Sequence, residues 1–123
     1  MKRILLLIVL FICLLGITGC SEDEFIRSGK ISCTQKEKIL KYENVKIIDV
    51  RAKEEYDERH LDNAINIPYE NIVEEIKNDS SINKDTPIIV YCKSGARSEK
   101  AYNSLKDAGY NHIYNLGAIT SCD

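Results

Sequence analysis

The chain of 123 residues has no tryptophan, only two histidines and two prolines, and no block of basic residues. Its histidines and cysteines lack the spacing of metal ligands, so the sequence predicts neither a metal site nor a cofactor. The 17 lysines and arginines are mixed with 19 aspartates and glutamates, without the interleaved aromatic residues of nucleic-acid-binding segments. These absences exclude metal-dependent chemistry and a nucleic-acid partner from the expected functions.

A hydrophobic run long enough to span a membrane is also missing. The apolar run from Ile4 to Ile17 follows two basic residues and falls short of the about 20 residues that a spanning helix needs. Its end, Ile17-Thr18-Gly19-Cys20, resembles the cleavage box of bacterial lipoproteins, which implies a signal peptide of residues 1–19 and a diacylglyceryl group on Cys20. Ordinary secretory cleavage nearby, with Cys20 as a free thiol, is the alternative. We expect an extracytoplasmic protein, lipid-anchored to the bacterial cell membrane.

The part that follows the signal peptide is long enough for one compact domain and too short for two. Residues 20–29 are charged and carry little apolar pattern, so we expect a flexible tether there and a domain over 30–123. Three cysteines remain in that domain. In an exported protein, three thiols suggest one disulfide and one free, reactive cysteine.

Apolar periodicity predicts strands that alternate with helices. A capping-box pattern at Thr34 to Glu37 places the start of the first helix, and Gly109 is expected to stop the last one. Because strands separated by helices pair in parallel, the order predicts an α/β fold. The expected strands are 30–32, 45–50, 64–67, 88–91 and 112–115, and the expected helices are 34–42, 53–58, 70–77 and 98–108.

Cys92 stands where an apolar strand ends and a helix begins, in the stretch YCKSGARS of residues 91–98. The unpaired amides of a first helical turn and the positive end of the helix dipole stabilise a thiolate, so the pKa of this thiol should fall. Small residues at 94–96 let loop amides turn towards the sulfur as an anion-binding nest, while Lys93 and Arg97 add positive charge. A small, inert core cysteine is the alternative. The loop favours a nucleophilic sulfur.

Four motifs in order resemble a single-domain rhodanese. They are Ile47-Ile48-Asp49-Val50-Arg51, Glu55-Tyr56, His60-Leu61 with Ala64-Ile65-Asn66-Ile67-Pro68, and Val90-Tyr91-Cys92-Lys93-Ser94-Gly95-Ala96-Arg97-Ser98. The resemblance covers roughly Ile31 to the C-terminus. It implies a rhodanese-like α/β fold, in which a parallel five-stranded sheet is flanked by helices.

The resemblance implies an enzyme that transfers sulfur. Cys92 would take the outer sulfur of thiosulfate or a persulfide, become a persulfide, and pass that sulfur to a thiol or cyanide. Arg97 would orient the loop or the incoming anion, or clamp loop carbonyls. Asp49 and Arg51 would support the loop through ion pairs, and Glu55 and His60 are expected to be structural. The loop residues that would bind the small sulfur-containing anion are Lys93, Ser94, Gly95, Ala96 and Ser98.

The sequence departs from the family pattern at three places. Arg59 and Asn63 stand where the family commonly has glycine; asparagine tolerates a left-handed turn, whereas Arg59 suggests a rebuilt loop. Cys122 falls about where the family has a tryptophan. Because the family fold makes the first and last strands parallel neighbours, the resemblance implies a Cys33–Cys122 disulfide, which would stabilise the domain by a few kcal/mol.

Other functions stay open at this point. Cys122 could instead resolve an oxidised or persulfidated Cys92, in a thiol-disulfide or persulfide-sensing protein. An anchored binding module without catalysis is a third class, although such modules normally lose the loop cysteine. Phosphatases with a comparable loop place five residues between cysteine and arginine, whereas Cys92 and Arg97 enclose four, so we expect no phosphatase.

Overall fold

The computed structural model describes residues 25–123. The expected signal peptide, residues 1–19, and the expected lipidation site, Cys20, lie outside this range. Within it, no helix combines the length and apolar character needed to cross a membrane.

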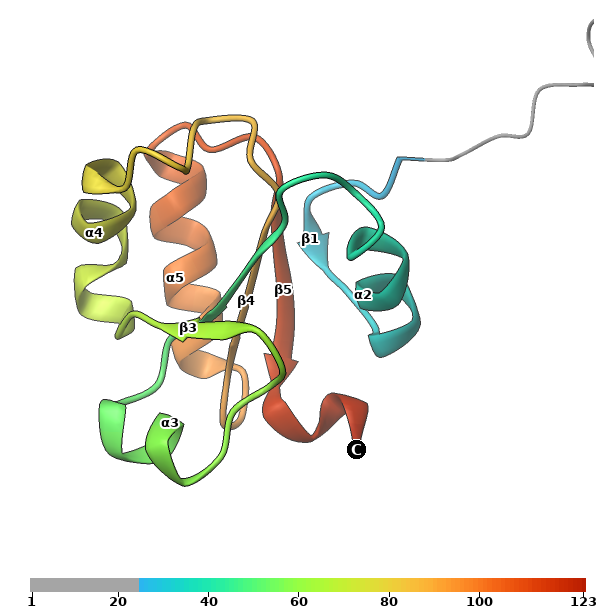
Figure 1. Cartoon of the computed structure of the whole chain (residues 1–123), viewed down its shortest axis with the longest axis vertical. Coiled ribbons are helices and arrows are strands. Elements are labelled where there is room, and N and C mark those ends of the chain that lie inside the picture. The colour runs from blue at the N-terminus through green and yellow to red at the C-terminus, as the bar shows by residue number, and fades with distance from the viewer. Residues whose placement is uncertain (1–24) are drawn as a thin grey trace, which may run out of the picture.

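Five strands form one parallel sheet in the order β1-β5-β4-β2-β3 (Figure 1). The α/β fold that the sequence predicted is confirmed. The strands are β1 (Gly29–Lys30), β2 (Lys46–Asp49), β3 (Ala64–Asn66), β4 (Ile88–Cys92) and β5 (Ile113–Ala118).

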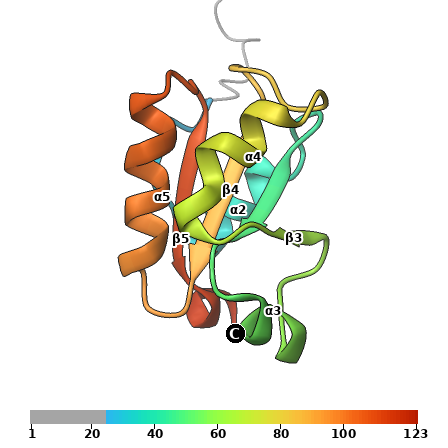
Figure 2. The ribbon, with the colours of Figure 1, turned by 90° about the vertical axis from the view of Figure 1, so that its left-hand side faces the viewer.

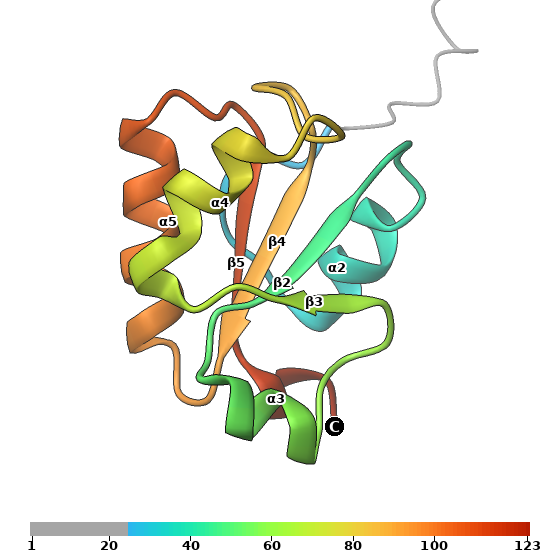
Figure 3. The same cartoon turned by 60° about the vertical axis from the view of Figure 1, so that its left-hand side comes forward.

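Helices cover both faces of the sheet. In Figure 2, α4 and α5 lie in front of the strands, and in Figure 3, α2 lies on the opposite side of β2. The helices are α2 (Cys33–Ile39), α3 (Lys53–Glu58), α4 (Ile72–Asn78) and α5 (Ala96–Asp107), with short 3₁₀ turns η1 (Tyr69–Asn71) and η2 (Ile119–Cys122).

Alternation along the central strands divides the core between the two faces. On β4, Ile88, Val90 and Cys92 pack against α4 and α5, whereas Ile89 and Tyr91 pack on the α2 side. All five side chains are buried, as expected for a parallel strand covered on both faces. This alternation fixes the side of the sheet on which the Cys92 sulfur lies.

The carboxyl ends of the strands meet at one end of the molecule. Figure 1 shows α3, the turn between β4 and α5, and the C-terminus together at this lower end. The register pairs Asp49 of β2 with Tyr91, and Ala118 of β5 with Cys92. Ligands of open parallel sheets bind at such an edge, so the fold places Cys92 where a ligand can reach it.

The capping box of α2 differs from the predicted one. Ser32, not Thr34, is the N-cap: its Oγ accepts from the amide of Gln35 at 3.2 Å, and Oε1 of Gln35 accepts from the amide of Ser32 at 2.9 Å. Both four-residue patterns fit the motif, and the extended backbone of Ser32 selects the earlier one. The helix ends at Ile39 rather than about residue 42.

Two residues of the expected tether contact the domain. Phe25 stacks on Tyr42, with ring centroids 5.2 Å apart, and contacts His112 edge-on at 4.9 Å. Oγ of Ser28 donates to the carbonyl of Asn111 at 2.9 Å. Phe25 and Ser28 therefore lie against the domain, whereas both remain exposed in part. His112 is half-buried beside Phe25.

Candidate active site

Cys92 is the last residue of β4 and is 1% exposed. Its Sγ accepts a hydrogen bond from the amide of Gly95 at 2.9 Å and lies 3.6 Å from Oγ of Ser98. In that contact Oγ of Ser98 accepts from the Cys92 thiol, and the hydroxyl of Ser98 donates to the carbonyl of Gly95 at 3.0 Å. The turn between strand and helix therefore wraps around the sulfur.

Gly95 gives this turn its shape. It is the N-cap of α5 and has a φ of 104°, in the left-handed region that side chains other than glycine rarely adopt. A Cβ built at Gly95 would have no close contact, with Cα of Gly117 the nearest atom at 3.9 Å. Backbone conformation, rather than lack of space, therefore requires glycine where the amide points at the sulfur.

The surroundings of Cys92 favour its thiolate. Burial alone would raise the pKa of the thiol, but hydrogen bonding with the Ser98 side chain and with the amides of Ser98, Gly95 and Ser94 outweighs it, so the pKa is lowered. A thiolate stabilised by amides at a helix N-terminus is an activated nucleophile. The loop sequence alone predicted that the pKa of this thiol is lowered.

Arg97 does not clamp loop carbonyls in the structure. Its two terminal nitrogens donate to the two carboxylate oxygens of Glu55 on α3, at 2.6 and 3.0 Å. The hydrogen bonds from Arg97 hold the pKa of Glu55 at about 2, and those to Glu55 raise the pKa of Arg97. Glu55, which the sequence suggested to be structural, thus holds the arginine of the Cys92 loop.

Asp49 and Arg51 form a buried ion pair at the carboxyl end of β2. Nε of Arg51 donates to Oδ1 of Asp49 at 3.0 Å, and Nη2 donates to Oδ2 at 2.7 Å. The guanidinium also lies 5.9 Å from the ring centre of Tyr91, the residue before Cys92. The pair therefore contacts the end of β4 through Tyr91.

The remaining predicted site residues lie at the surface of the loop or away from it. Lys93, Ser94 and Ala96 are exposed, whereas Ser98 is buried beside the sulfur. His60 stacks on Tyr56, with ring centroids 3.9 Å apart, and is exposed. The structure thus brings Gly95 and Ser98 to Cys92 and leaves His60 outside.

The loop between α3 and β3 accommodates both departures from the family pattern. Asn63 has a φ of 62°, the left-handed conformation that asparagine tolerates. Arg59 pairs with the carboxylate of Asp123, and its carbonyl accepts from Nη2 of Arg51. Arg59 therefore joins this loop to the C-terminal residue and to the buried pair. No sequence pattern pointed to either contact.

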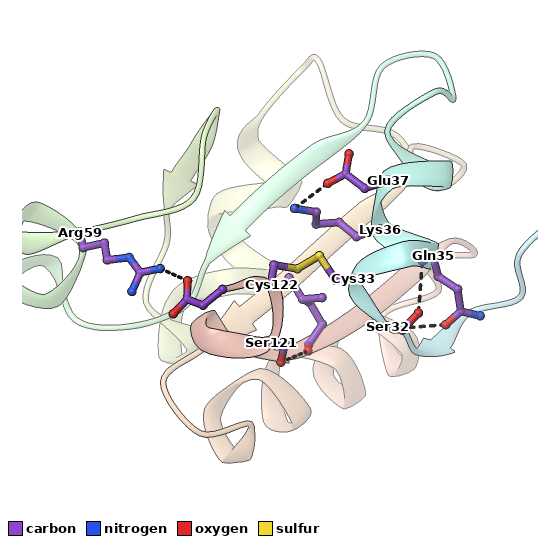
Figure 4. Close-up of a disulfide and its surroundings, with 10 residues drawn as sticks. Ser32, Cys33, Gln35, Lys36, Glu37, Arg59, Ser121 and Cys122 are labelled. Carbon is purple, nitrogen blue, oxygen red and sulfur yellow. Dashed lines mark hydrogen bonds and ion pairs between the residues drawn. A yellow bond between two sulfur atoms is a disulfide. The ribbon is translucent and has the colours of Figure 1, made fainter.

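Cys33 and Cys122 form a disulfide with a Cα–Cα distance of 5.2 Å (Figure 4), the pair that the family resemblance implied. Cys92 is the only free cysteine among residues 25–123. Because the sulfur of Cys122 is bonded to Cys33, it is not available to resolve Cys92 in this structure. The geometry therefore favours sulfur chemistry at Cys92 alone over the dithiol alternative.

A groove of about 770 Å³ lies on the α2 side of the sheet. Lys36, Arg59 and Cys122 are among its lining residues, and no residue of the Cys92 loop lines it. Within residues 25–123, no group of three or more His, Cys, Asp and Glu residues could hold a metal ion. The candidate site is thus the turn around Cys92, not this groove.

The family model for the rhodanese-like domain matches residues 32–119 of the chain. The chain belongs to the rhodanese-like family. A curated relative is thiosulfate sulfurtransferase PspE of Escherichia coli, 39% identical over 72 residues that make up 58% of this chain and 68% of the relative. Three further curated relatives are longer, and the chain spans less than half of their length.

Solved structures show the same rhodanese-like fold. A rhodanese with anions from E. coli is 35% identical, with a TM-score of 0.59 over 63% of this chain and 89% of that one. The human single-domain sulfurtransferase TSTD1 is 17% identical, with a TM-score of 0.66 over 79% of this chain and 95% of that one, and shows the fold alone. The rhodanese-like five-stranded sheet is therefore confirmed.

Proposed function

We propose that this rhodanese-like chain is a sulfurtransferase that moves sulfane sulfur from thiosulfate or a persulfide to a thiol or cyanide, through a persulfide on Cys92. The observation that carries the proposal is the hydrogen bond from the Gly95 amide to Sγ of Cys92, 2.9 Å long, in a turn that lowers the pKa of the thiol. The family and its relative named thiosulfate sulfurtransferase support the same chemistry.

The reaction takes place in two displacements. In the first, the Cys92 thiolate forms a bond to the sulfane sulfur, and the bond between that sulfur and the donor breaks, its electron pair leaving with the donor as sulfite or a thiolate. In the second, the acceptor's lone pair bonds to the outer sulfur and Cys92 leaves as the thiolate. No cofactor is required because each displacement is balanced in atoms and electrons.

The other residues would hold the sulfur and shape the turn. The amides around residues 94–98 would stabilise the anionic outer sulfur, as an anion-binding nest does. Asp49 and Arg51 would keep the end of β2 rigid beside Tyr91, and thereby position Cys92. Arg97 would act through its pair with Glu55 rather than through loop carbonyls.

Intact mass of the purified full chain tests the proposal. After incubation with thiosulfate, and separately with a small persulfide, we expect a gain of one sulfur atom on Cys92 that cyanide discharges. The Cys92→Ser variant is the control and should gain none. No gain with either donor would contradict sulfur transfer.

We further propose that the protein is exported and anchored to the membrane by a lipid on Cys20. The support comes from the sequence, namely the short apolar run after two basic residues and the Thr18-Gly19-Cys20 box. Fractionation of cells that make the full chain tests it: the wild type should sediment with membranes, and Cys20→Ala should not. An unchanged distribution would contradict the lipid anchor.

A further inference from the structure

The charged groups next to the Cys92 turn form a balanced set. Asp49 and Glu55 carry two negative charges, and Arg51 and Arg97 carry two positive ones. Each arginine uses two guanidinium nitrogens on one carboxylate, with nitrogen to oxygen distances of 2.6 to 3.1 Å. The set as a whole therefore has no net charge with which to attract an anion.

Arg97, which follows the Cys92 loop at the start of α5, already has both terminal nitrogens engaged. An arginine recognises a sulfonate or carboxylate by presenting two N–H groups side by side. Both terminal nitrogens of Arg97 already donate to Glu55, whose side chain is 30% exposed, as is that of Arg97. A second anion at this fork would have to displace the carboxylate or bind without the paired donors.

Other cations near the turn are poor substitutes. Lys93 is exposed and has no ion pair among the described residues, so its charge is strongly screened by water. The loop amides carry only partial charges, and one of them already contacts Sγ of Cys92. The site therefore stabilises one negative charge on sulfur well and a second, neighbouring charge poorly.

We propose that Glu55 determines donor specificity: by holding Arg97 in a two-pronged ion pair, it selects donors with a single negative charge near the reacting sulfur, such as persulfides and thiosulfonates, over dianionic thiosulfate. The inference rests on the proposed sulfur transfer at Cys92 and narrows its substrate class. Glu55 acts through Arg97 and does not contact the donor.

Two donors that differ in charge but react in the same way isolate the effect of the donor's charge on the rate. Methanethiosulfonate and thiosulfate both offer a terminal sulfur bonded to an oxidised sulfur, but the first is a monoanion and the second a dianion. In both reactions the Cys92 thiolate forms the new S–S bond, and the old bond breaks with its electron pair on the leaving group. That group is methanesulfinate or sulfite, and no proton or outside electron is needed.

The experiment measures the rate constant of Cys92 persulfide formation per donor concentration, by intact mass, in the purified full chain. Wild type should prefer methanethiosulfonate, and Glu55→Gln should raise the rate with thiosulfate about ten-fold, equal to about 1.4 kcal/mol, with a smaller change for methanethiosulfonate. Glu54→Gln removes the same charge from the same helix at an exposed position and should leave the donor ratio unchanged.

A reciprocal variant makes the test independent of one substitution. Arg97→Gln leaves Glu55 unpaired, so thiosulfate should react more slowly while methanethiosulfonate is affected less. The double variant Glu55→Gln, Arg97→Gln restores neutrality and should return the donor ratio towards that of wild type. Circular dichroism melting of each variant shows whether the fold is kept.

The pH dependence gives a further control. The hydrogen bonds from Arg97 hold the pKa of Glu55 at about 2, so the carboxylate stays charged well below the ordinary glutamate pKa of about 4.3. Protonation of Cys92 slows persulfide formation with both donors equally. The donor ratio of wild type should thus stay constant from neutral pH down to about pH 4.

The possible failures are distinguishable. If neither donor loads Cys92, the proposed sulfur transfer is wrong, and the donor specificity falls with it. If both donors load Cys92 but wild type prefers thiosulfate, or if the ratio is the same in wild type, Glu55→Gln and Arg97→Gln, sulfur transfer stands and the role of Glu55 is overturned.

Discussion

Glu55 and Arg97 are 42 positions apart in the sequence, and their side chains join through two hydrogen bonds of 2.6 and 3.0 Å. The pair connects α3, a helix with no buried residue, to the first turn of α5. Because Ser98 in that same turn contacts the sulfur of Cys92, a residue on an exposed helix is linked to the candidate nucleophile.

Ser98→Ala tests the stabilisation of the Cys92 thiolate. The hydroxyl of Ser98 lowers the pKa of the thiol, so its loss should raise that pKa and slow alkylation by iodoacetamide several-fold at neutral pH. A lowered pKa means that the thiolate persists below the ordinary thiol pKa of about 8.5 and is lost only as the pH falls through the folded value. Ser98→Ala should shift the alkylation profile to higher pH.

Ser94→Ala is the matched control for this profile. Ser94 is an exposed residue of the same loop, and the substitution keeps its backbone amide. Its alkylation profile should match that of wild type. An equal shift in both variants would assign the effect to the loop in general rather than to the Ser98 hydroxyl.

Gly95→Ala tests the need for a left-handed residue beside the sulfur. At a φ of 104°, alanine is strained, and we expect a loss of about 1 to 3 kcal/mol in the free energy of unfolding, together with slower persulfide formation. Gly109→Ala is the control, because Gly109 has a φ of 91° at the other end of α5. Gly109→Ala should lower the stability of the domain against urea to a similar extent and leave persulfide formation on Cys92 intact. Slower loading in both variants would show that strain alone, not the amide beside the sulfur, matters.

Asp49→Asn tests the buried pair. The side chains of Asp49 and Arg51 are 0% and 8% exposed, and an uncompensated buried arginine typically costs about 3 to 5 kcal/mol. Urea unfolding should show this loss. Asp57→Asn breaks the exposed pair with Lys53 and should leave the unfolding midpoint unchanged. Equal midpoints for the two variants would refute the contribution of the buried pair.

Removal of the disulfide should destabilise the domain without stopping sulfur transfer. The bond closes a loop of 89 positions, which corresponds to about 4.6 kcal/mol in the chain-entropy account. Cys33→Ser with Cys122→Ser should therefore unfold at lower urea concentration. Cys92 lies in the core cluster on the α4 and α5 face and Cys122 packs on the other, so loading of the folded variant should persist. Complete loss of loading in the folded variant would instead give the disulfide a part in the chemistry.

Local patterns in the sequence predicted much of the fold. The strand around Ile88 to Tyr91 was predicted because β-branched residues follow one another between polar segments, and α3 was predicted with the observed bounds. The choice between two capping boxes at the start of α2 was not predictable. Both patterns are local, and the backbone conformation of Ser32 decides between them.

The sequence by itself determined that a cysteine stands at the end of a buried strand, followed by small residues and a helix. Neighbouring backbone groups create that environment, so the lowered pKa of Cys92 follows from residues within six positions of it. Only the tertiary structure decided that Arg97 pairs with Glu55 and that Arg59 pairs with Asp123. Side chains so far apart in sequence meet only after the sheet has aligned the carboxyl ends of its strands. The sequence alone offers many residues of opposite charge for each of these arginines and does not say which of them becomes its partner.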